Sequence, residues 1–228
     1  MSFYRVRGVP ALTASLCAAA CSSVTPLIVH DSAVLAPSGR VRVDLQRDAP
    51  GGWFVEGAFS DQEGDDRQGL ASSHTVVVDN VTFTGPDSLQ TDASLRVGEF
   101  VLGRSAIGEN VRFSIYSGLQ TIELDLDVRS SNQRASDQRS SNSWLVGAEF
   151  SAPMRSWLTL DGRADFSYSV SGDELTAQQF ELGVGLLPVP FARLFVGLSY
   201  RSLTQVVAGG SDIDLEFFGP ALGLRLDL

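Results

Sequence analysis

The stretch that ends the chain, Phe217 to Leu228, reads Phe-Phe-Gly-Pro-Ala-Leu-Gly-Leu-Arg-Leu-Asp-Leu. From Phe218 onward every second residue is apolar, and the residues between them are Gly, Ala, Arg and Asp. Alternation with a period of two predicts a β-strand with one apolar face and one small or charged face. Because this strand runs to the last residue, we expect its edge to be paired, and a closed barrel supplies such a partner.

The same alternation recurs through the second half of the chain and at the start of the first half. It predicts further strands over Trp144–Ser151, Trp157–Tyr168, Gln179–Leu186 and Arg193–Arg201, and a hairpin of Arg40–Gln46 with Trp53–Ser60. At 228 residues the chain is long enough for one domain with about eight to ten strands. The sequence therefore predicts an all-β protein.

The alternation is weaker between these regions. Residues Asp61–Ser73 are rich in acidic side chains and are expected to form a loop, whereas His74–Thr84 is β-prone but alternates poorly. The apolar positions change phase at Glu99-Phe100 and again near Gly118. A change of phase within a strand predicts a β-bulge at each place.

A soluble β-sandwich also alternates, so the connections between strands are needed to choose. Turns near Pro153 and Pro188–Pro190 are short, while Arg129–Asn142, Ser169–Thr176 and Thr204–Asp212 are expected to be longer polar loops. Short turns at one end and long loops at the other are typical of outer-membrane barrels. Trp and Tyr near the strand ends, and strands of about ten residues, favour the same architecture.

The terminal strand resembles that of Gram-negative outer-membrane β-barrels, although those most often end in Phe and this chain ends in Leu. Together with the back-half strands it makes the chain similar to small OmpA-type barrels. The resemblance implies a closed antiparallel up-and-down transmembrane barrel, with eight strands favoured and ten possible. It also implies contact with outer-membrane lipid and lipopolysaccharide, and recognition of the C-terminal strand by the barrel-assembly machinery. The alternative is a lipid-anchored periplasmic β-sandwich that binds a ligand or partner.

The beginning of the chain resembles an export signal. Arg5 and Arg7 precede a short apolar run, and Ala18-Ala19-Ala20-Cys21 is similar to a bacterial lipobox. We therefore expect a signal peptide over 1–20, lipidation at Cys21, a periplasmic tether over 21–38 and the barrel over 39–228. Ordinary cleavage near the same place, leaving Cys21 as a free thiol, is the alternative.

In a barrel whose apolar face looks outward, the charged side chains of the strands face the lumen. The candidates are Glu56, Glu149, Asp161, Arg163, Asp165, Glu181, Arg193, Arg201, Arg225 and Asp227. Charges in a narrow lumen must be paired, because an isolated buried charge costs several kcal/mol. A turn centred near Pro188 would place Glu181 opposite Arg193, and Glu149 is expected to approach Arg163. We interpret the set as a structural network that fills the lumen, with a polar gate for small solutes as the alternative.

The sequence contains little that indicates catalysis. Only two histidines are present, His30 and His74, and neither has an acidic partner at a convincing spacing for a lipid A-modifying hydrolase of the Ser-His type. The acidic stretch from Asp61 lacks the spacing of a calcium loop, and no cofactor motif occurs. A net charge of −10 argues against a nucleic-acid partner. We expect a non-enzymatic outer-membrane protein with a role in envelope integrity or surface interaction.

Overall fold

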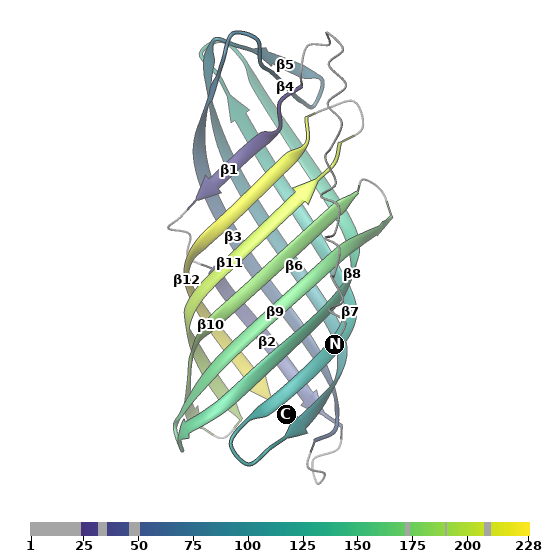
Figure 1. The fold of residues 1–228 in the computed structure, drawn as a ribbon, viewed down its shortest axis with the longest axis vertical. Coiled ribbons are helices and arrows are strands. Elements are labelled where there is room, and N and C mark those ends of the chain that lie inside the picture. The colour runs from purple at the N-terminus through teal and green to yellow at the C-terminus, as the bar shows by residue number, and fades with distance from the viewer. Residues whose placement is uncertain (1–23, 32–35, 46–50, 172–173, 190, 208–210) are drawn as a thin grey trace, which may run out of the picture.

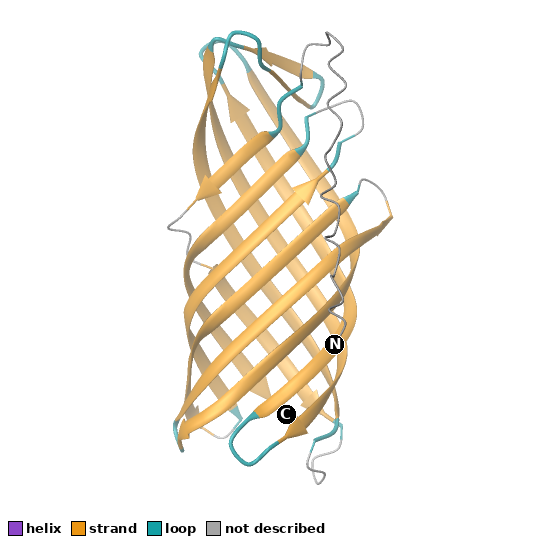
Figure 2. Cartoon of the chain, in the orientation of Figure 1, coloured by secondary structure: helices purple, strands orange, loops and turns teal. Residues whose placement is uncertain are grey.

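The structure is a computed structural model that describes residues 24–31, 36–45, 51–171, 174–189, 191–207 and 211–228. The strands are β1 (Leu27–Asp31), β2 (Ala36–Asp44), β3 (Trp53–Leu70), β4 (Thr75–Val78), β5 (Val81–Thr84), β6 (Asp87–Ile107), β7 (Arg112–Arg129), β8 (Arg134–Arg155), β9 (Leu158–Ser171), β10 (Leu175–Val189), β11 (Ala192–Gln205) and β12 (Ile213–Asp227). All regular structure in these residues is β (Figure 2). They include no helix of the length and apolar character needed to cross a bilayer.

The long strands close into a tilted barrel (Figure 1). Successive strands from β2 through β3 and β6 to β12 pair antiparallel, and β12 then pairs in parallel with β2. The prediction of an all-β barrel is confirmed, and the sandwich alternative is wrong for the described residues. The predicted eight or ten strands and purely antiparallel pairing are also wrong, because the barrel has nine strands and one parallel pair. An odd number of strands makes the first and last run in the same direction, which forces this parallel closure.

The first two strands share one edge of β12. β1 pairs with Ile213–Phe217 and β2 pairs with Ala221–Asp227, both in parallel. The expectation of a tether over 21–38 is therefore wrong where the structure describes it, because β1 and the start of β2 belong to the wall. Val24 forms a bridge to Thr75 of β4, whereas the C-terminus lies at the other end of the barrel (Figure 1). The end of the barrel where β4 pairs with β5 is named the hairpin end, and the opposite end is named the C-terminal end.

Two segments that were expected to be loops are strands. The acidic segment after Ser60 continues β3 to Leu70, and β8 begins at Arg134, so β7 and β8 are joined by residues 130–133 alone. Polar side chains on both faces of these segments hid the strand pattern: the outer face is polar, and the inner face carries Gly, Asp, Gln, Ser or Arg beside the few apolar residues. The expected contrast between long and short connections is correspondingly smaller.

The predicted bulges at Glu99-Phe100 and Gly118 are absent. β6 keeps an unbroken register with β3 over Asp87–Arg104 and with β7 over Gln90–Ile107, and β7 keeps one with β8 past Gly118. The register shifts that do occur lie in β8–β9 and β10–β11. On β6 the inward residues are Leu95 and Val97 toward the hairpin end and Gly103 and Ser105 toward the C-terminal end. The backbone alternates regularly, and the apolar residues change from the inner to the outer face near Gly98.

The same change of face occurs on β7, β10, β11 and β12 and divides the barrel into two halves, although β9 keeps an apolar outer face as far as Val170. Toward the C-terminal end the outer face is apolar, and we call this set of exposed side chains the outer belt: Val41, Val43, Trp53, Phe59, Phe100, Leu102, Phe113, Ile115, Leu119, Trp144, Val146, Leu160, Phe166, Tyr168, Phe180, Leu182, Leu194, Val196, Leu198, Phe218, Leu222 and Leu224. Toward the hairpin end the outer face is polar. For example, Phe59 is followed on the outer face of β3 by Asp61, Glu63 and Asp65.

The interior of the hairpin-end half is a hydrophobic core. It is formed by Leu27, Val29, Leu70, Val76, Val78, Phe83, Leu89, Ala93, Leu95, Val97, Ile122, Leu124, Leu126, Val128, Ala135, Leu175, Ala177, Leu203, Ile213, Leu215 and Phe217. Three of these, Val76, Val78 and Phe83, come from the β4–β5 hairpin, which lies across the end of the barrel (Figure 1). The hairpin therefore closes this end of the lumen with apolar side chains.

Candidate functional site: a charged network inside the barrel

The C-terminal-end half of the lumen contains charged side chains, packed around a small apolar cluster of Phe54, Val101, Tyr116 and Leu145. The strands place all ten of the charged residues expected in the lumen on the inner face: Glu56, Glu149, Asp161, Arg163, Asp165, Glu181, Arg193, Arg201, Arg225 and Asp227. Burial of so many charges is tolerated only where each is paired or hydrogen-bonded. The contacts between them show how this is achieved.

Arg163 lies at the centre of the network. Its Nη1 is 2.7 Å from Glu56 Oε1, its Nη2 is 2.7 Å from Glu99 Oε2, and its Nε is 2.6 Å from Asp165 Oδ2. Its guanidinium also lies over the Tyr116 ring, 4.8 Å from the ring centroid. One arginine on β9 therefore joins β3, β6 and β7 across the lumen. Each of its three guanidinium nitrogens bonds a different carboxylate.

A second cluster lies closer to the C-terminal end. Glu149 accepts hydrogen bonds from Arg42 and, at 3.0 Å, from Arg225 Nη1. Arg42 is fully buried, its guanidinium stacks on Phe54 at 3.4 Å from the ring centroid, and it also bonds Ser105. This cluster connects β2, β8 and β12, so it spans the parallel closure of the barrel.

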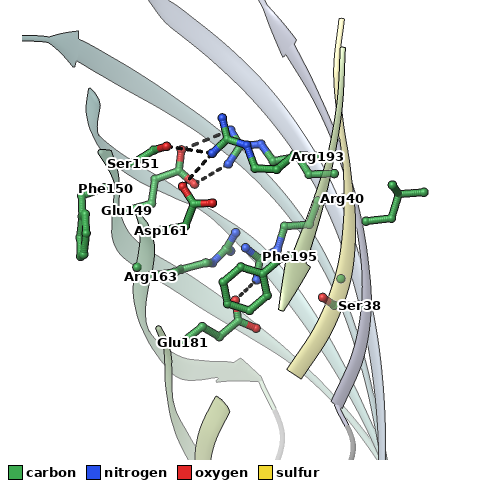
Figure 3. Close-up of a pocket in the computed structure, with 14 residues that line it drawn as sticks. Ser38, Arg40, Glu149, Phe150, Ser151, Asp161, Arg163, Glu181, Arg193 and Phe195 are labelled. Carbon is green, nitrogen blue, oxygen red and sulfur yellow. Dashed lines mark hydrogen bonds and ion pairs between the residues drawn. The ribbon is translucent and has the colours of Figure 1, made fainter. Parts of the chain in front are cut away.

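Two smaller pairs complete the network. Arg40 bonds Glu181, and Arg193 Nη1 lies 2.8 Å from Asp161 Oδ1 and 2.9 Å from Ser151 Oγ. Figure 3 shows how Arg193 and Arg163 reach across the same space from β11 and β9. The pairs bring together strands that are distant in sequence.

A small cavity lies among these side chains (Figure 3). It has a volume of about 40 Å³ and is lined by both cationic and anionic groups, among them Arg40, Glu149, Asp161 and Arg193. A single water needs about 10–15 Å³, so this space is large enough for a few waters at most. It is a small polar pocket within a packed lumen and is far smaller than a channel.

Arg201 is held differently from the other arginines. It is 3% exposed, and its described partners are neutral: Nε donates to Gln179 Oε1 at 3.1 Å and Nη2 to Ser60 Oγ at 3.1 Å. It lies at the boundary with the apolar core, beside Leu203. At this level the lumen changes from charged residues to amides and hydroxyls, including Gln120, Ser143 and Ser167, before it becomes apolar.

The two expected pairings have different outcomes. Glu149 does lie directly opposite Arg163 in the β8–β9 ladder, although its ion partners are Arg42 and Arg225. The expected pairing of Glu181 with Arg193 is wrong. β10 continues to Val189 and β11 begins at Ala192, so the turn falls later than Pro188 and Glu181 faces Ser199 instead.

Sequence reasoning missed several members of the network. Arg40 and Arg42 on β2 and Glu99 on β6 all face inward, as does Tyr116 of β7, whose hydroxyl donates to Asp165. For Arg40 and Arg42 the signal was present, because they alternate with Val41 and Val43. Glu99 and Tyr116 were hidden by the change of face on β6 and β7.

The remaining candidates lie away from this network. Cys21 and the expected signal peptide lie outside the described residues. His30 is on β1, where its Nδ1 is 2.9 Å from Glu216 Oε2, and His74 precedes β4. Within the described part of the chain, neither histidine bonds a serine hydroxyl, and no group of three or more His, Cys, Asp or Glu side chains has the geometry of a metal site.

Comparison with known proteins adds no relative to this description. No family model matches the chain, and neither a curated protein nor a solved structure matches it.

Proposed function

We propose that this chain is a non-enzymatic β-barrel protein of a Gram-negative outer membrane, with a role in envelope integrity or surface interaction. The outer belt would lie in the hydrocarbon region, and the hairpin-end half would project beyond it. Lipid and lipopolysaccharide would surround the wall, and the C-terminal strand β12 would be the element that the barrel-assembly machinery recognises.

The observation that carries the proposal is the change of face around the barrel. An apolar outer face over a charged interior is unfavourable in water, because it exposes large apolar side chains and buries ion pairs. In a bilayer the same arrangement is favourable, since the outer side chains meet lipid and the charges stay in the lumen. The hairpin-end half has the opposite arrangement, which suits water. One strand such as β7 combines both, with Ile115 exposed at one end and Leu124 buried at the other.

The contents of the lumen favour a structural role over transport. The apolar core closes the hairpin-end half, and the Arg163 and Glu149 clusters fill the other half. A barrel of nine strands is narrow enough for side chains alone to fill it. A path for small solutes would have to pass through both the apolar core and the charged clusters.

The position of Val24 determines at which end of the barrel the proposed lipid anchor would attach. Val24 lies at the hairpin end, and three residues of extended chain span at most about 11 Å. An acyl group on Cys21 would therefore attach at the hairpin end, opposite to the C-terminus. Lipidation itself remains a prediction from the Ala-Ala-Ala-Cys sequence.

The proposal can be tested by the depth of the tryptophans in a bilayer. Trp53 and Trp144 are about half exposed on the outer face, and Trp157 is about half exposed in the turn before β9; all three lie near the borders of the outer belt. We expect the folded protein to insert into phospholipid vesicles and its fluorescence to be quenched by lipids brominated on the acyl chains. A protein that stays in solution with folded β-structure, with tryptophans quenched by aqueous iodide alone, would show that the barrel is water-soluble and the proposal wrong.

A further inference from the structure

The barrel wall between β1 and β3 is built differently from the ladders that join the other neighbouring strands described. β2 pairs with β3 only as far as Ser60. Beyond it, residues 61–70 of β3 have β6 on one side and β1 on the other, and the described pairings include no ladder between β1 and β3. We call this boundary, formed by Pro26–Asp31 and Asp65–Gln68, the seam.

Side chains take the place of the ladder at the seam. Gln68 accepts a hydrogen bond from Ile28 N at 3.2 Å through Oε1 and donates to Pro26 O at 3.2 Å through Nε2. Asp66 Oδ2 accepts from His30 N at 3.0 Å, and Asp31 Oδ2 accepts from Asp65 N at 3.2 Å. Two of these four bonds are exposed and two are partly buried, so water can replace them.

The other contacts of β1 are a short ladder and a packed inner face. β1 pairs with five residues of β12, and its Leu27 and Val29 are fully buried in the apolar core. Phe217 of β12 lies over Gly64 of β3, behind the seam. The inner face therefore favours the closed wall, while the edge toward β3 contributes little cooperativity with the rest of the sheet.

The position of the seam agrees with this construction. On β3 it lies beyond Ser60, where the ladder with β2 ends, and beyond the border of the outer belt at Phe59, so it is wholly in the half with a polar outer face. In the belt half backbone ladders join the neighbouring strands from β2 through β3 and β6 to β12, and β12 pairs with β2 from Ala221 onward, as a bilayer requires. Side-chain bonding occurs only where water is available to the edge.

We propose that β1 is a releasable strap: it leaves the seam by local opening while the nine-stranded barrel below it stays folded. Local opening of this kind occurs where backbone bonds are exposed and few strands are coupled. An open seam exposes the edges of β3 and β12.

Hydrogen exchange on the full chain, folded in detergent, tests the proposal directly. Val29 lies level with Leu203 through Leu215, so the two strands can be compared at the same height. We expect the amides of Leu27 and Val29, on the edge of β1 that faces β12, to exchange at least tenfold faster than those of Ser202 and Leu203. Equal protection of the two strands would show that β1 opens only with the whole barrel and would overturn the proposal.

Substitutions separate a side-chain latch from simple fraying of a chain end. Asp66→Ala removes the acceptor for His30 N and should raise the exchange of β1 at least threefold further, without changing β11. Arg67→Ala, whose side chain is exposed on the outer face, is the matched control and should change neither strand. If Asp66→Ala and Arg67→Ala behave alike, the side chains at the seam do not hold the strap.

A thiol probe gives an independent reading. In a background with Cys17→Ser and Cys21→Ser, Val29→Cys and Leu203→Cys each place one thiol in the apolar core. We expect a water-soluble maleimide to modify Val29→Cys at least tenfold faster than Leu203→Cys. Equal rates at the two positions would contradict release of β1.

Discussion

Arg163 on β9 donates Nη1 to Glu56 on β3 at 2.7 Å, and these two strands are four steps apart around the barrel in one direction and five in the other. The pair therefore crosses the lumen at its full width. Both side chains are almost completely buried, at 3% and 2% exposure. A charge at this position is kept only because three carboxylates and the Tyr116 ring surround the guanidinium.

Arg163→Met should destabilise the folded barrel strongly. Removing the cation leaves Glu56, Glu99 and Asp165 close together without their shared partner, and breaking a buried ion pair costs about 3–5 kcal/mol. Urea titration in detergent micelles measures the loss. Arg104→Met, at an exposed position on β6, is the control and should stay within about 0.5 kcal/mol of the parent. Equal midpoints for the two variants would show that the network does not hold the lumen together.

Gly147→Ala should destabilise the same region by overpacking. A Cβ at Gly147 would lie 2.3 Å from Asp165 Oδ1 and 2.5 Å from the Tyr116 ring, whose hydroxyl bonds that carboxylate. We expect a loss of about 1–3 kcal/mol in the free energy of unfolding. Gly98→Ala is the matched control, because a Cβ there meets no atom within 4 Å. A cost at Gly98 as large as that at Gly147 would mean that the loss comes from the backbone and not from packing in the lumen.

Much of the architecture could be predicted from strands whose outer face stays apolar along its length. The outer face of β12 from Phe218 to Leu224 is apolar throughout, so its period of two was visible. On β6 and β7 the environment changes, and the apolar residues move from Ile115 on the outer face to Leu124 on the inner face. A rule that assigns apolar residues to one face reads this as a bulge, although the register is continuous.

The closure and the ion pairs could not be predicted for a different reason. Whether β2 meets β12 in parallel depends on the number of strands between them, which the blurred alternation of β6 and β7 concealed. Arg163 and Glu56 are 107 residues apart, and their contact follows from strand tilt and register around the ring. Local alternation predicts which face of the sheet each side chain lies on, but it does not predict which residue that side chain contacts.

Planar bilayers test whether the lumen conducts. We expect the reconstituted protein to give no stable conductance steps, because the apolar core around Leu124 and the network around Arg163 block the path in series. An open porin inserted in the same bilayer serves as the positive control. Stable steps that persist over a range of voltages would support the polar-gate alternative and contradict a sealed lumen.

Asp127 should make stability depend on acidic pH. Hydrogen bonds from Arg129 and Arg134, with their positive charges, lower the pKa of Asp127 to about 2. A carboxyl whose pKa is lower in the folded state stabilises the fold above its unfolded value, about 3.9, and this contribution disappears as pH falls through about 2. Arg129→Ala should raise the pKa of Asp127 toward its usual value, measured by NMR titration of the carboxyl carbon. Arg67→Ala, on β3, should leave it unchanged, and an unchanged pKa in Arg129→Ala would show that the ion pair does not form.

Arginine substitutions along the outer face of β10 should locate the bilayer. Leu182 is 56% exposed within the outer belt, whereas Gln178 is on the same face of the same strand beyond the border at Phe180. In phospholipid vesicles Leu182→Arg should lower the free energy of unfolding by about 2–4 kcal/mol, because the charge must enter hydrocarbon, and Gln178→Arg should lower it by less than about 1 kcal/mol. If both variants unfold alike in vesicles, the apolar outer face of β10 does not lie in the membrane, and the proposed position of the belt is wrong.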